Sequence, residues 1–358
     1  MTAAGDRVPE SLLVVRLGAM GDIIHTLPAV TALRKAFPST RMGWVVEERW
    51  AELLCAKNNP RSGARGPARP VVDYVHAVDT KRWRKSLLSR TTQRQIAAAL
   101  SEVRDQKYEI AVDFQGALKS AVIARCAGTA AVFGMEHPRE APARVLYKRR
   151  VQSKGTHVIE QYYSLAEAVA GKPLPNGRAE FPRDHDAEEA VTNKLKHTGM
   201  NVLLINPGAG WGAKQWPSER YGEVAGALSQ QGLVPLINLG PGEQELAEAV
   251  RSSSGGAARL ISCSIGELIA LTRRAKLLIG GDTGPLHLAA ALNIPVVAIF
   301  GPTDPARNGP YGTKSIVLRN PASRTSLSHT SMPDTGLSAI TAMEVIAAAR
   351  HLLGTSHA

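Results

Sequence analysis

The chain has 358 residues, of which 44% are hydrophobic, and it carries a formal net charge of +12. This length allows two α/β domains with separate cores, and no apolar run reaches the roughly 20 residues of a membrane-spanning helix. The positive charge favours an anionic partner: nucleic acid, a membrane surface or an acidic substrate. Three cysteines, far apart in the sequence and without metal-ligand spacing, are typical of a reduced cytoplasmic protein.

Strand and helix patterns alternate through the first half of the chain. Short apolar runs predict strands at residues 12–16, 42–46, 71–78, 110–113 and 132–133. Helical periodicity predicts helices at residues 23–37, 93–103, 117–127 and 158–170. Residues 58–70 are rich in Pro, Gly, Ser and Arg without periodicity, so we expect a mobile loop there.

The alternation restarts after residues 171–182, which hold three prolines and two glycines and are typical of a connection between domains. We predict strands at residues 202–205, 234–239, 277–279 and 296–300. We predict helices at residues 221–231, 243–251, 265–274, 285–292 and 340–353, whereas residues 321–338 give no regular signal. The expected organisation is a first domain (1–171), a linker (172–183), a second domain (184–339) and a C-terminal helix (340–358) that packs back on the first domain.

This alternation predicts an α/β fold of two Rossmann-like, doubly wound domains that face each other across a cleft. Ligands of such sheets bind at the carboxyl ends of the strands, where a helix N-terminus attracts an anion. The turn after the strand at 277–279 has this form, so Asp282, Thr283, Gly284 and His287 are candidates for contacts to a phosphorylated ligand. A structural turn in which Asp282 caps the helix explains the same spacing equally well.

Three other turns at strand ends carry polar candidates. The first turn, RLGAMGD, lacks G-x-G-x-x-G, and its Asp22 could act as a general base or simply cap the next helix. The turn at residues 208–210 is glycine-rich and precedes Lys214, a combination that suits a pyrophosphate, although an isolated lysine is more often solvated. Glu243 follows another strand and could bind a ribose hydroxyl or stabilise a helix N-terminus.

A basic segment lies in the first half. Residues 80–101 contain six basic residues and no acid, and a solvated basic face is the ordinary explanation for such a cluster. Trp83, within this segment, has an amphipathic ring that suits a membrane interface. The segment is the main candidate for contact with an anionic partner.

In combination, seven segments resemble the lipopolysaccharide heptosyltransferases of glycosyltransferase family 9. The resemblance covers about residues 12–311, and WVVEE, RWRK and REAPA are more similar to the enzymes that add the first heptose than to those that add later ones. The segments are RLGAMGDIIHTLPAVTALRKAFP, WVVEE, RWRK, DFQGALKSA, REAPARVLY, AKQWP and GGDTGPLHLAAALNIPVVAIFGPTDP.

The resemblance implies a GT-B fold and inverting, metal-independent transfer of L-glycero-D-manno-heptose from ADP-heptose onto the Kdo of Kdo2-lipid A. This reaction belongs to lipopolysaccharide inner-core biosynthesis and needs no cofactor and no nucleic acid. The resemblance further implies a cytoplasmic enzyme that is peripheral on the inner membrane.

The resemblance also assigns roles to single residues. Asp22 matches the catalytic base, and Lys214 matches a lysine that acts on the donor phosphates and in catalysis. The implied donor-binding residues are Gly208, Ala209, Gly210, Lys214, Glu243, Cys263, Asp282, Thr283, Gly284 and His287. The implied acceptor-binding residues are Lys81, Arg82, Arg84, Lys85, Gln115, Lys119 and Arg139, and no metal ligand is implied.

Two positions depart from the family pattern. Ala209 and Gly210 stand where the family has a threonine pair, and Cys263 stands where it has a methionine near the donor base. Three other functions fit parts of the sequence: a related glycosyltransferase with a different acceptor, a dinucleotide-dependent oxidoreductase, and a non-catalytic module that binds polyanions.

Overall fold

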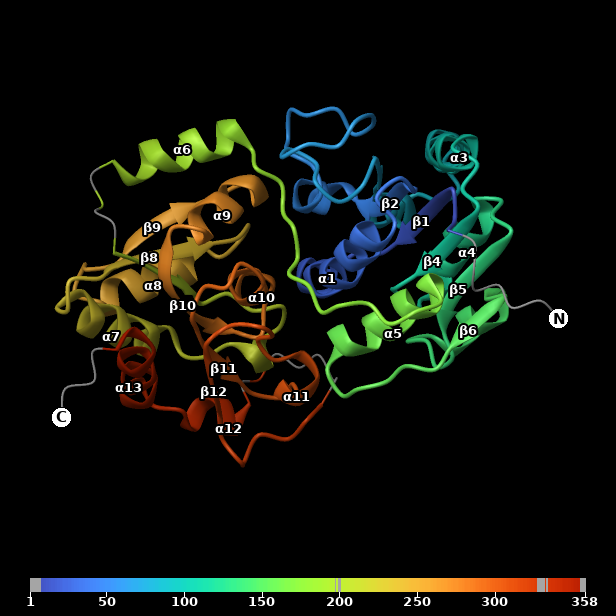
Figure 1. Ribbon diagram of the computed structural model, residues 1–358. Helices are drawn as coiled ribbons and strands as arrows, with labels where there is room; N and C mark the ends of the chain where they lie inside the picture. Colours follow the sequence, from blue (N-terminus) through green and yellow to red (C-terminus); the bar gives the residue numbers. More distant parts are fainter. Residues whose placement is uncertain (1–7, 197, 199–200, 327–331, 333, 355–358) are drawn as a thin grey trace. The chain divides into compact units, whose positions relative to one another are not determined.

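The computed structural model describes residues 8–196, 198, 201–326, 332 and 334–354. The chain divides into two compact units, Met1–Asp184 and His185–Ala358. Within the described ranges each unit contains one sheet of six parallel strands covered by helices (Figure 1). Residues 172–183 form neither helix nor strand, and the backbone amide of Gly177 donates to the Tyr163 hydroxyl (2.7 Å), which ties this stretch to the first unit.

The first unit follows the predicted alternation. Its strands are β1 (Ser11–Val15), β2 (Arg41–Glu47), β3 (Tyr74–Val78), β4 (Ile110–Asp113), β5 (Ala131–Met135) and β6 (Arg149–Val151). Its α-helices are α1 (Met20–Ala36), α2 (Thr80–Lys85), α3 (Arg90–Asp105), α4 (Leu118–Cys126) and α5 (Val158–Ala170), and its 3-10 helices are η1 (Glu48–Leu53) and η2 (Ala141–Leu146). The helix α5 ends at Gly171, whose φ of 66° is left-handed and therefore favours glycine.

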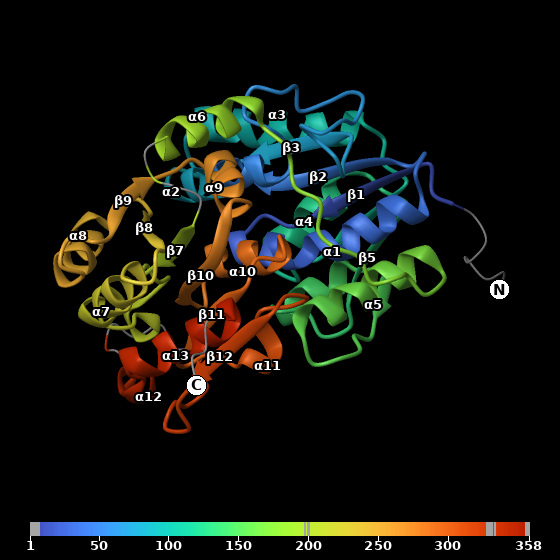
Figure 2. The ribbon, with the colours of Figure 1, turned by 60° about the vertical axis from the view of Figure 1, so that its left-hand side comes forward.

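The strand order of the first sheet is β3-β2-β1-β4-β5-β6, the order of a doubly wound fold. Helices α1 and α5 pack against each other on one face, while α3 and α4 cover the other face (Figures 1 and 2). Because β1 is central, all five of its side chains are buried. Leu13 and Val15 pack with Val103 of α3 and Ala121 of α4, so the core forms between sheet and helices.

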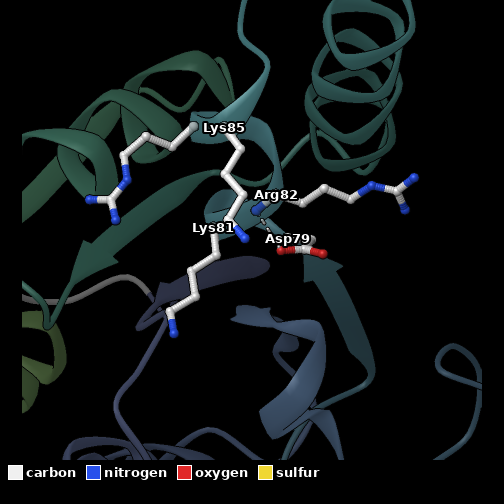
Figure 3. Close-up of a pocket in the computed structure, with 5 residues that line it drawn as sticks. Asp79, Lys81, Arg82 and Lys85 are labelled. Carbon is white, nitrogen blue, oxygen red and sulfur yellow. Dashed lines mark hydrogen bonds between the residues drawn. The ribbon is translucent and has the colours of Figure 1, made fainter.

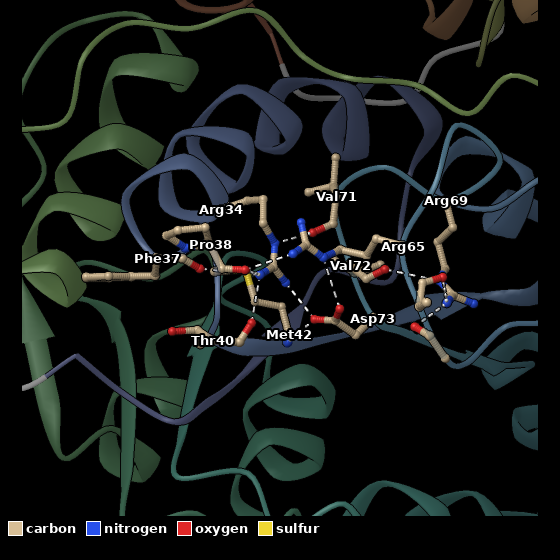
Figure 4. Close-up of polar contacts among 12 residues, drawn as sticks. Arg34, Phe37, Pro38, Thr40, Met42, Arg65, Arg69, Val71, Val72 and Asp73 are labelled. Atoms are coloured by element: carbon tan, nitrogen blue, oxygen red, sulfur yellow. Dashed lines mark hydrogen bonds and ion pairs between the residues drawn. The ribbon is translucent and has the colours of Figure 1, made fainter.

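The stretch 58–70, expected to be a mobile loop, is instead an ordered loop fastened by buried arginines (Figure 4). The Arg69 side chain is 1% exposed and donates to the carbonyls of Gly63 (2.6 Å) and Ala64 (3.0 Å). Arg65 pairs with Asp73 (3.0 Å), which also pairs with Arg34 of α1 (2.6 Å). These guanidinium groups satisfy loop carbonyls that would otherwise need water, which is why the loop is ordered without secondary structure.

The second unit repeats the arrangement of the first. Its strands are β7 (Val202–Asn206), β8 (Val234–Leu239), β9 (Arg259–Ser262), β10 (Ala275–Gly281), β11 (Val296–Phe300) and β12 (Ser315–Arg319). Its α-helices are α6 (His185–Leu195), α7 (Ser218–Ser229), α8 (Gln244–Ser253), α9 (Ile265–Thr272), α10 (Gly284–Ala291), α11 (Pro305–Asn308), α12 (Thr335–Ala339) and α13 (Ala342–Leu353), with one 3-10 helix, η3 (Gly212–Lys214). Of the segment 321–338, residues 327–331 and 333 lie outside the described residues.

The second sheet has the order β12-β11-β10-β7-β8-β9, again doubly wound. Helices α7, α8 and α13 contribute to the core on one face, and α6, α9 and α10 to the core on the other. Val345 and Ala349 of α13 are buried in the core of the second unit. The apolar face of α13 thus packs against β11, β12 and α7 within the second unit, and the packing of the C-terminal helix on the first domain stays a prediction.

Candidate functional site

The candidate donor residues lie at the carboxyl edge of the second sheet. In this sheet β7 and β10 are neighbours, and the helices that follow them leave on opposite faces, which makes this position the topological switch point. Asn206 ends β7 and the turn at 208–210 follows it; Glu243 follows β8, Cys263 follows β9, and Asp282 follows β10. The strand order therefore brings four separate stretches of sequence to one edge.

The centre of this edge is an ion cluster of Lys214, Asp282 and His287. The Asp282 carboxylate accepts from the Lys214 ammonium through Oδ2 and from His287 Nε2 (2.9 Å) through Oδ1. The side chains of Lys214, Asp282 and His287 are only 11%, 8% and 6% exposed. Burial by itself would raise the pKa of Asp282, but the hydrogen bond and charge of His287 and the charge of Lys214 outweigh it and hold the pKa well below its usual range.

Lys214 is also held from its other side. Its ammonium lies 4.2 Å from the centre of the Trp211 ring, a cation–π contact that fixes the side chain above the turn. Lys214 is therefore an oriented and largely buried cation, which excludes the ordinary alternative of a solvated surface lysine.

Helix α10 begins beside this cluster, and its first turn offers backbone donors. Thr283 is the N-cap, but its side chain makes no cap hydrogen bond; its hydroxyl donates to the Gly281 carbonyl (3.2 Å) and accepts from Asn206 Nδ2 (3.3 Å). Asp282 is likewise not the cap, because its oxygens bind Lys214 and His287. Among the described residues no side chain caps the N–H groups of Gly284 and Leu286 in this first turn, and such groups suit an anion; Pro285 between them has no N–H.

The turns after β7 and β8 meet in close contact. A Cβ atom at Gly208 would lie 2.0 Å from Oε1 of Glu243, so any larger residue there would displace this carboxylate. Oε2 of Glu243 accepts from the Gly240 amide (2.7 Å), which fixes the carboxylate beside the turn at 208–210. Glu245, two residues further along in the first turn of α8, is exposed.

The two departures from the family pattern have distinct settings. Ala209 is half-buried, and Gly210 is exposed with open space at its Cβ position, so this turn can offer only backbone groups and no hydroxyl. Cys263 is half-buried, and burial raises the pKa of its thiol to about 11, so it is a neutral side chain at the end of β9.

In the first unit Asp22 lies at the carboxyl end of β1, on the first turn of α1. Its Oδ2 pairs with Arg16 (2.8 Å) and accepts from the Ala19 amide (3.0 Å), so the carboxylate does stabilise the helix start, as the capping alternative predicted. The Asp22 side chain is nevertheless 38% exposed, and among the described residues its Oδ1 makes no hydrogen bond or ion pair. One carboxylate oxygen is therefore anchored and the other is accessible to a substrate.

Arg16 is a site residue that sequence reasoning missed. Its side chain is 5% exposed, its Nη1 donates to the Phe114 carbonyl (2.6 Å), and its Nη2 pairs with Asp22. Burial by itself would lower the pKa of Arg16, but the nearby Tyr162, Asp22 and Asp113 outweigh this effect and raise the pKa above its usual value. The guanidinium group is therefore a permanent cation. The available signal was its position: an arginine at the last residue of the predicted first strand, directly before the glycine-rich turn.

The acceptor candidates come from three segments at the carboxyl edge of the first sheet. Lys119 of α4 donates from Nζ to the Thr80 hydroxyl (3.2 Å) at the start of α2, and Oε1 of Gln115 accepts from the Leu17 amide (2.8 Å). The backbone of Arg139 lies so close to Gly116 that a Cβ there would be 3.0 Å from the Arg139 nitrogen. The segment after β4 is thus in contact both with the start of α2 after β3 and with the loop after β5.

Helix α2 presents the basic segment around a shallow hollow (Figure 3). The hollow is lined by Asp79, Lys81, Arg82, Arg84 and Lys85. Asp79 is the N-cap of α2, and its carboxylate accepts from the backbone amide of Arg82 (2.9 Å). This carboxylate therefore stabilises the start of the helix. In Figure 3 the Arg82 side chain points away from Lys81 and Lys85, so the cations around the hollow do not all point to one place.

Asp113, at the end of β4, shapes the loop that carries Gln115. It is completely buried; Oδ1 accepts from the amides of Gln115 (2.9 Å) and Gly116 (3.2 Å), and Oδ2 accepts from the hydroxyls of Ser120 (2.9 Å) and Tyr147 (2.8 Å). Burial raises the pKa of Asp113, and these four donors counteract that rise. Sequence analysis did not single out this residue, because its role depends on contacts with distant residues.

Two further properties concern metals and membranes. Within the described ranges, no three His, Cys, Asp or Glu side chains form a group suited to a metal ion. Among the helices that the structure describes, none combines the length and the apolar character needed to cross a bilayer.

Comparisons with known proteins agree on one family. Residues 96–334 match the profile of glycosyltransferase family 9 (heptosyltransferase). Lipopolysaccharide heptosyltransferase 1 of Pseudomonas aeruginosa is 30% identical over 312 residues, which cover 86% of this chain and 83% of that protein.

Two solved structures of the E. coli heptosyltransferase WaaC are also similar. The structure with ADP has 27% identity and a TM-score of 0.77, covering 96% of this chain and 99% of that chain. The structure with ADP-2-deoxy-2-fluoro heptose has 28% identity and a TM-score of 0.71, covering 88% and 95%. The α/β fold of two doubly wound units is thus of the GT-B type. The chain is a glycosyltransferase and belongs to family 9, the heptosyltransferases.

Proposed function

We propose that this chain transfers L-glycero-D-manno-heptose from ADP-heptose onto the Kdo of Kdo2-lipid A, with inversion and without a metal ion, in lipopolysaccharide inner-core biosynthesis. The ion cluster of Lys214, Asp282 and His287 beside the start of α10 is the observation that carries this proposal. The similarity to a structure with an ADP-heptose analogue supports the nature of the donor.

The cluster provides what a nucleoside diphosphate sugar requires. The N–H groups at the start of α10 and the Lys214 ammonium are oriented donors for the two phosphates. As the bond to the sugar breaks, negative charge grows on the departing ADP, and Lys214 stabilises that charge. Before binding, Asp282 neutralises Lys214, so the diphosphate competes with Asp282 for the same cation.

Metal independence is inferred from how the carboxylate is used. A metal-dependent transferase needs carboxylates that are free to hold a divalent cation on the diphosphate. Both oxygens of Asp282 already bind cationic or donating side chains. Lys214 then replaces the metal as the source of positive charge.

Asp22 is the proposed base. A Kdo hydroxyl gives its proton to Oδ1 of Asp22 as its oxygen attacks the anomeric carbon of the heptose from the side opposite the diphosphate. The new C–O bond forms as the bond to the phosphate oxygen breaks, which inverts the anomeric configuration and releases ADP. Arg16 keeps Oδ2 anchored, so that Oδ1 remains directed at the acceptor.

The acceptor is proposed to bind the basic segment of the first unit. Kdo carries carboxylates and lipid A carries phosphates, and Arg82, Arg84, Lys81 and Lys85 are exposed cations suited to both. Lys119 of α4 contacts this segment through Thr80, and Gln115 and Arg139 lie on the loops before and beside α4, so these residues complete the proposed site. Because this acceptor is a membrane lipid, we place the enzyme on the cytoplasmic face of the inner membrane.

The decisive experiment measures ADP release from ADP-heptose with and without Kdo2-lipid A, with the product identified by mass spectrometry. Lys214→Ala should weaken ADP binding and slow turnover by about 10² or more, the usual effect of losing a group that stabilises developing charge. Lys276→Ala, an exposed lysine on β10, is the matched control and should behave as wild type. Absence of heptosylated product, or activity that is lost with EDTA and restored by magnesium, would contradict the proposal.

A further inference from the structure

The turn between α2 and α3 exposes two leucines. The Ser89 amide donates to the Ser86 carbonyl (2.9 Å), which closes a four-residue turn with Leu87 and Leu88 at its centre. Their exposed fractions are 54% and 93%. Neither side chain belongs to the apolar cores of the described residues.

This exposure is built into the turn. The hydroxyls of Ser86 and Thr92 are hydrogen bonded to each other (2.8 Å), and the Gln93 amide donates to the Ser89 carbonyl (2.9 Å), so both sides of the turn are fixed. The centre of such a turn is usually Gly, Pro, Asn, Asp or Ser, whereas two leucines there leave apolar surface exposed to water without any gain in packing. The leucines are therefore presented to an outside partner.

Basic residues flank the turn on both sides in the sequence. They all lie within a sequence stretch, residues 80–101, that has no acidic residue, and they are exposed. They are Lys81, Arg82, Arg84, Lys85, Arg90 and Arg94. Trp83, expected at a membrane interface, is half-buried and packs partly against the core, so the leucines are the exposed apolar groups.

We propose that residues 81–94 form an interfacial anchor in which Leu87 and Leu88 enter the headgroup layer of an anionic bilayer. An apolar tip flanked by cations suits this partner, because the cations bind lipid phosphates while the leucines reach the acyl boundary. Two adjacent leucines cover far too little area for a stable protein interface, which needs about 800 Å² on each partner. The inference rests on the proposed function in one respect, since a lipid acceptor is what brings the enzyme to a bilayer.

The anchor can be tested by vesicle flotation of the full chain. Wild type should float with vesicles of phosphatidylethanolamine and phosphatidylglycerol, and much less with phosphatidylcholine alone. The double variant Leu87→Ser with Leu88→Ser should bind the anionic vesicles roughly tenfold more weakly for each leucine, the usual value of transferring one such side chain from water. Met343→Ser, which removes an 80% exposed apolar side chain from α13 of the second unit, is the matched control and should float as wild type does.

A second measurement reports the depth of the turn. In Leu88→Trp, lipids brominated on their acyl chains should quench the added tryptophan, beyond any quenching of wild type. Added salt should weaken binding of both wild type and the serine variant, because the cations act in both. Wild type that does not float, a serine variant that floats equally well, or a Leu88→Trp side chain that is not quenched would each overturn the anchor.

Activity assays separate this inference from the proposed function. With a deacylated, water-soluble Kdo acceptor, the serine variant should release ADP as fast as wild type; with Kdo2-lipid A in vesicles it should be slower. Equal rates of the two proteins in vesicles would contradict the anchor and leave the transfer reaction intact. Absence of ADP release from wild type with either acceptor would instead contradict the transfer reaction, while flotation would still report on the anchor.

Discussion

Replacement of Asp282 by asparagine tests the ion cluster directly. Asparagine keeps the shape and one acceptor oxygen, but it leaves the Lys214 ammonium, 11% exposed, without its counter-charge. Among the described residues Asp282 is the only carboxylate that pairs with Lys214. Breaking a buried pair costs about 3–5 kcal/mol, and we expect about 3 kcal/mol because the Trp211 ring still contacts the cation.

The expected readout is a thermal shift. For a unit of this size, about 3 kcal/mol lowers the midpoint of thermal unfolding by about 6–12 °C. ADP brings negative charge back to Lys214, so a saturating concentration should raise the midpoint of Asp282→Asn by more than that of wild type. Asp304→Asn, the same substitution at the half-buried cap of α11, should shift the midpoint only slightly, because asparagine caps nearly as well as aspartate.

The effect should also depend on pH in a defined direction. Because the pKa of Asp282 is held below its usual range, its contribution to stability is fully present above the unfolded value of about 3.9 and is lost as pH falls towards the folded value. Wild type and Asp282→Asn should therefore differ most at neutral pH and converge in acid. Equal midpoints at neutral pH, or an equal response to ADP, would refute the reasoning.

Three other predictions follow from the described contacts. Asp22→Asn should retain ADP affinity and lower turnover by about 10²–10⁴, the usual value of a general base, as measured by ADP release; turnover at the wild-type rate would exclude Asp22 as the base. Arg82→Glu combined with Arg84→Glu should raise the acceptor KM about tenfold and leave the donor KM unchanged, and added salt should have the same effect. The control Lys314→Glu, an exposed lysine of the second unit, should leave both KM values unchanged. Burial lowers the pKa of His76, so the unfolded chain takes up a proton more readily than the folded chain does. The free energy of unfolding of the first unit should therefore fall between about pH 7 and pH 5. His76→Gln should make this fall smaller, and an unchanged fall would show that His76 is not its source.

Much of the fold was predictable because buried parallel strands and amphipathic helices leave local signals. The predicted bounds of β4, β8, β11 and α5 match the structure residue for residue. The edge strand β6 was not predicted, because its three residues include two exposed arginines and resemble a surface loop. The order of residues 58–70 was also unpredictable, since Arg69 reaches the loop carbonyls only once the chain has folded back.

The candidate site, like the fold, was predictable from the sequence only in part. Local patterns were sufficient to identify the polar turns that hold Asp22, Lys214 and Asp282, because each follows an apolar run and precedes a helix. Tertiary structure alone decided their partners: Lys214 meets Asp282 across 68 positions of sequence, and a buried arginine meets Asp22. Neighbouring strands of a parallel sheet are joined by crossovers and need not be adjacent in the chain, so β7 and β10 become neighbours only when the whole sheet assembles. Which side chains meet at the strand ends is therefore decided by the order of the strands in the folded sheet. Which turns carry polar side chains is already decided by the sequence.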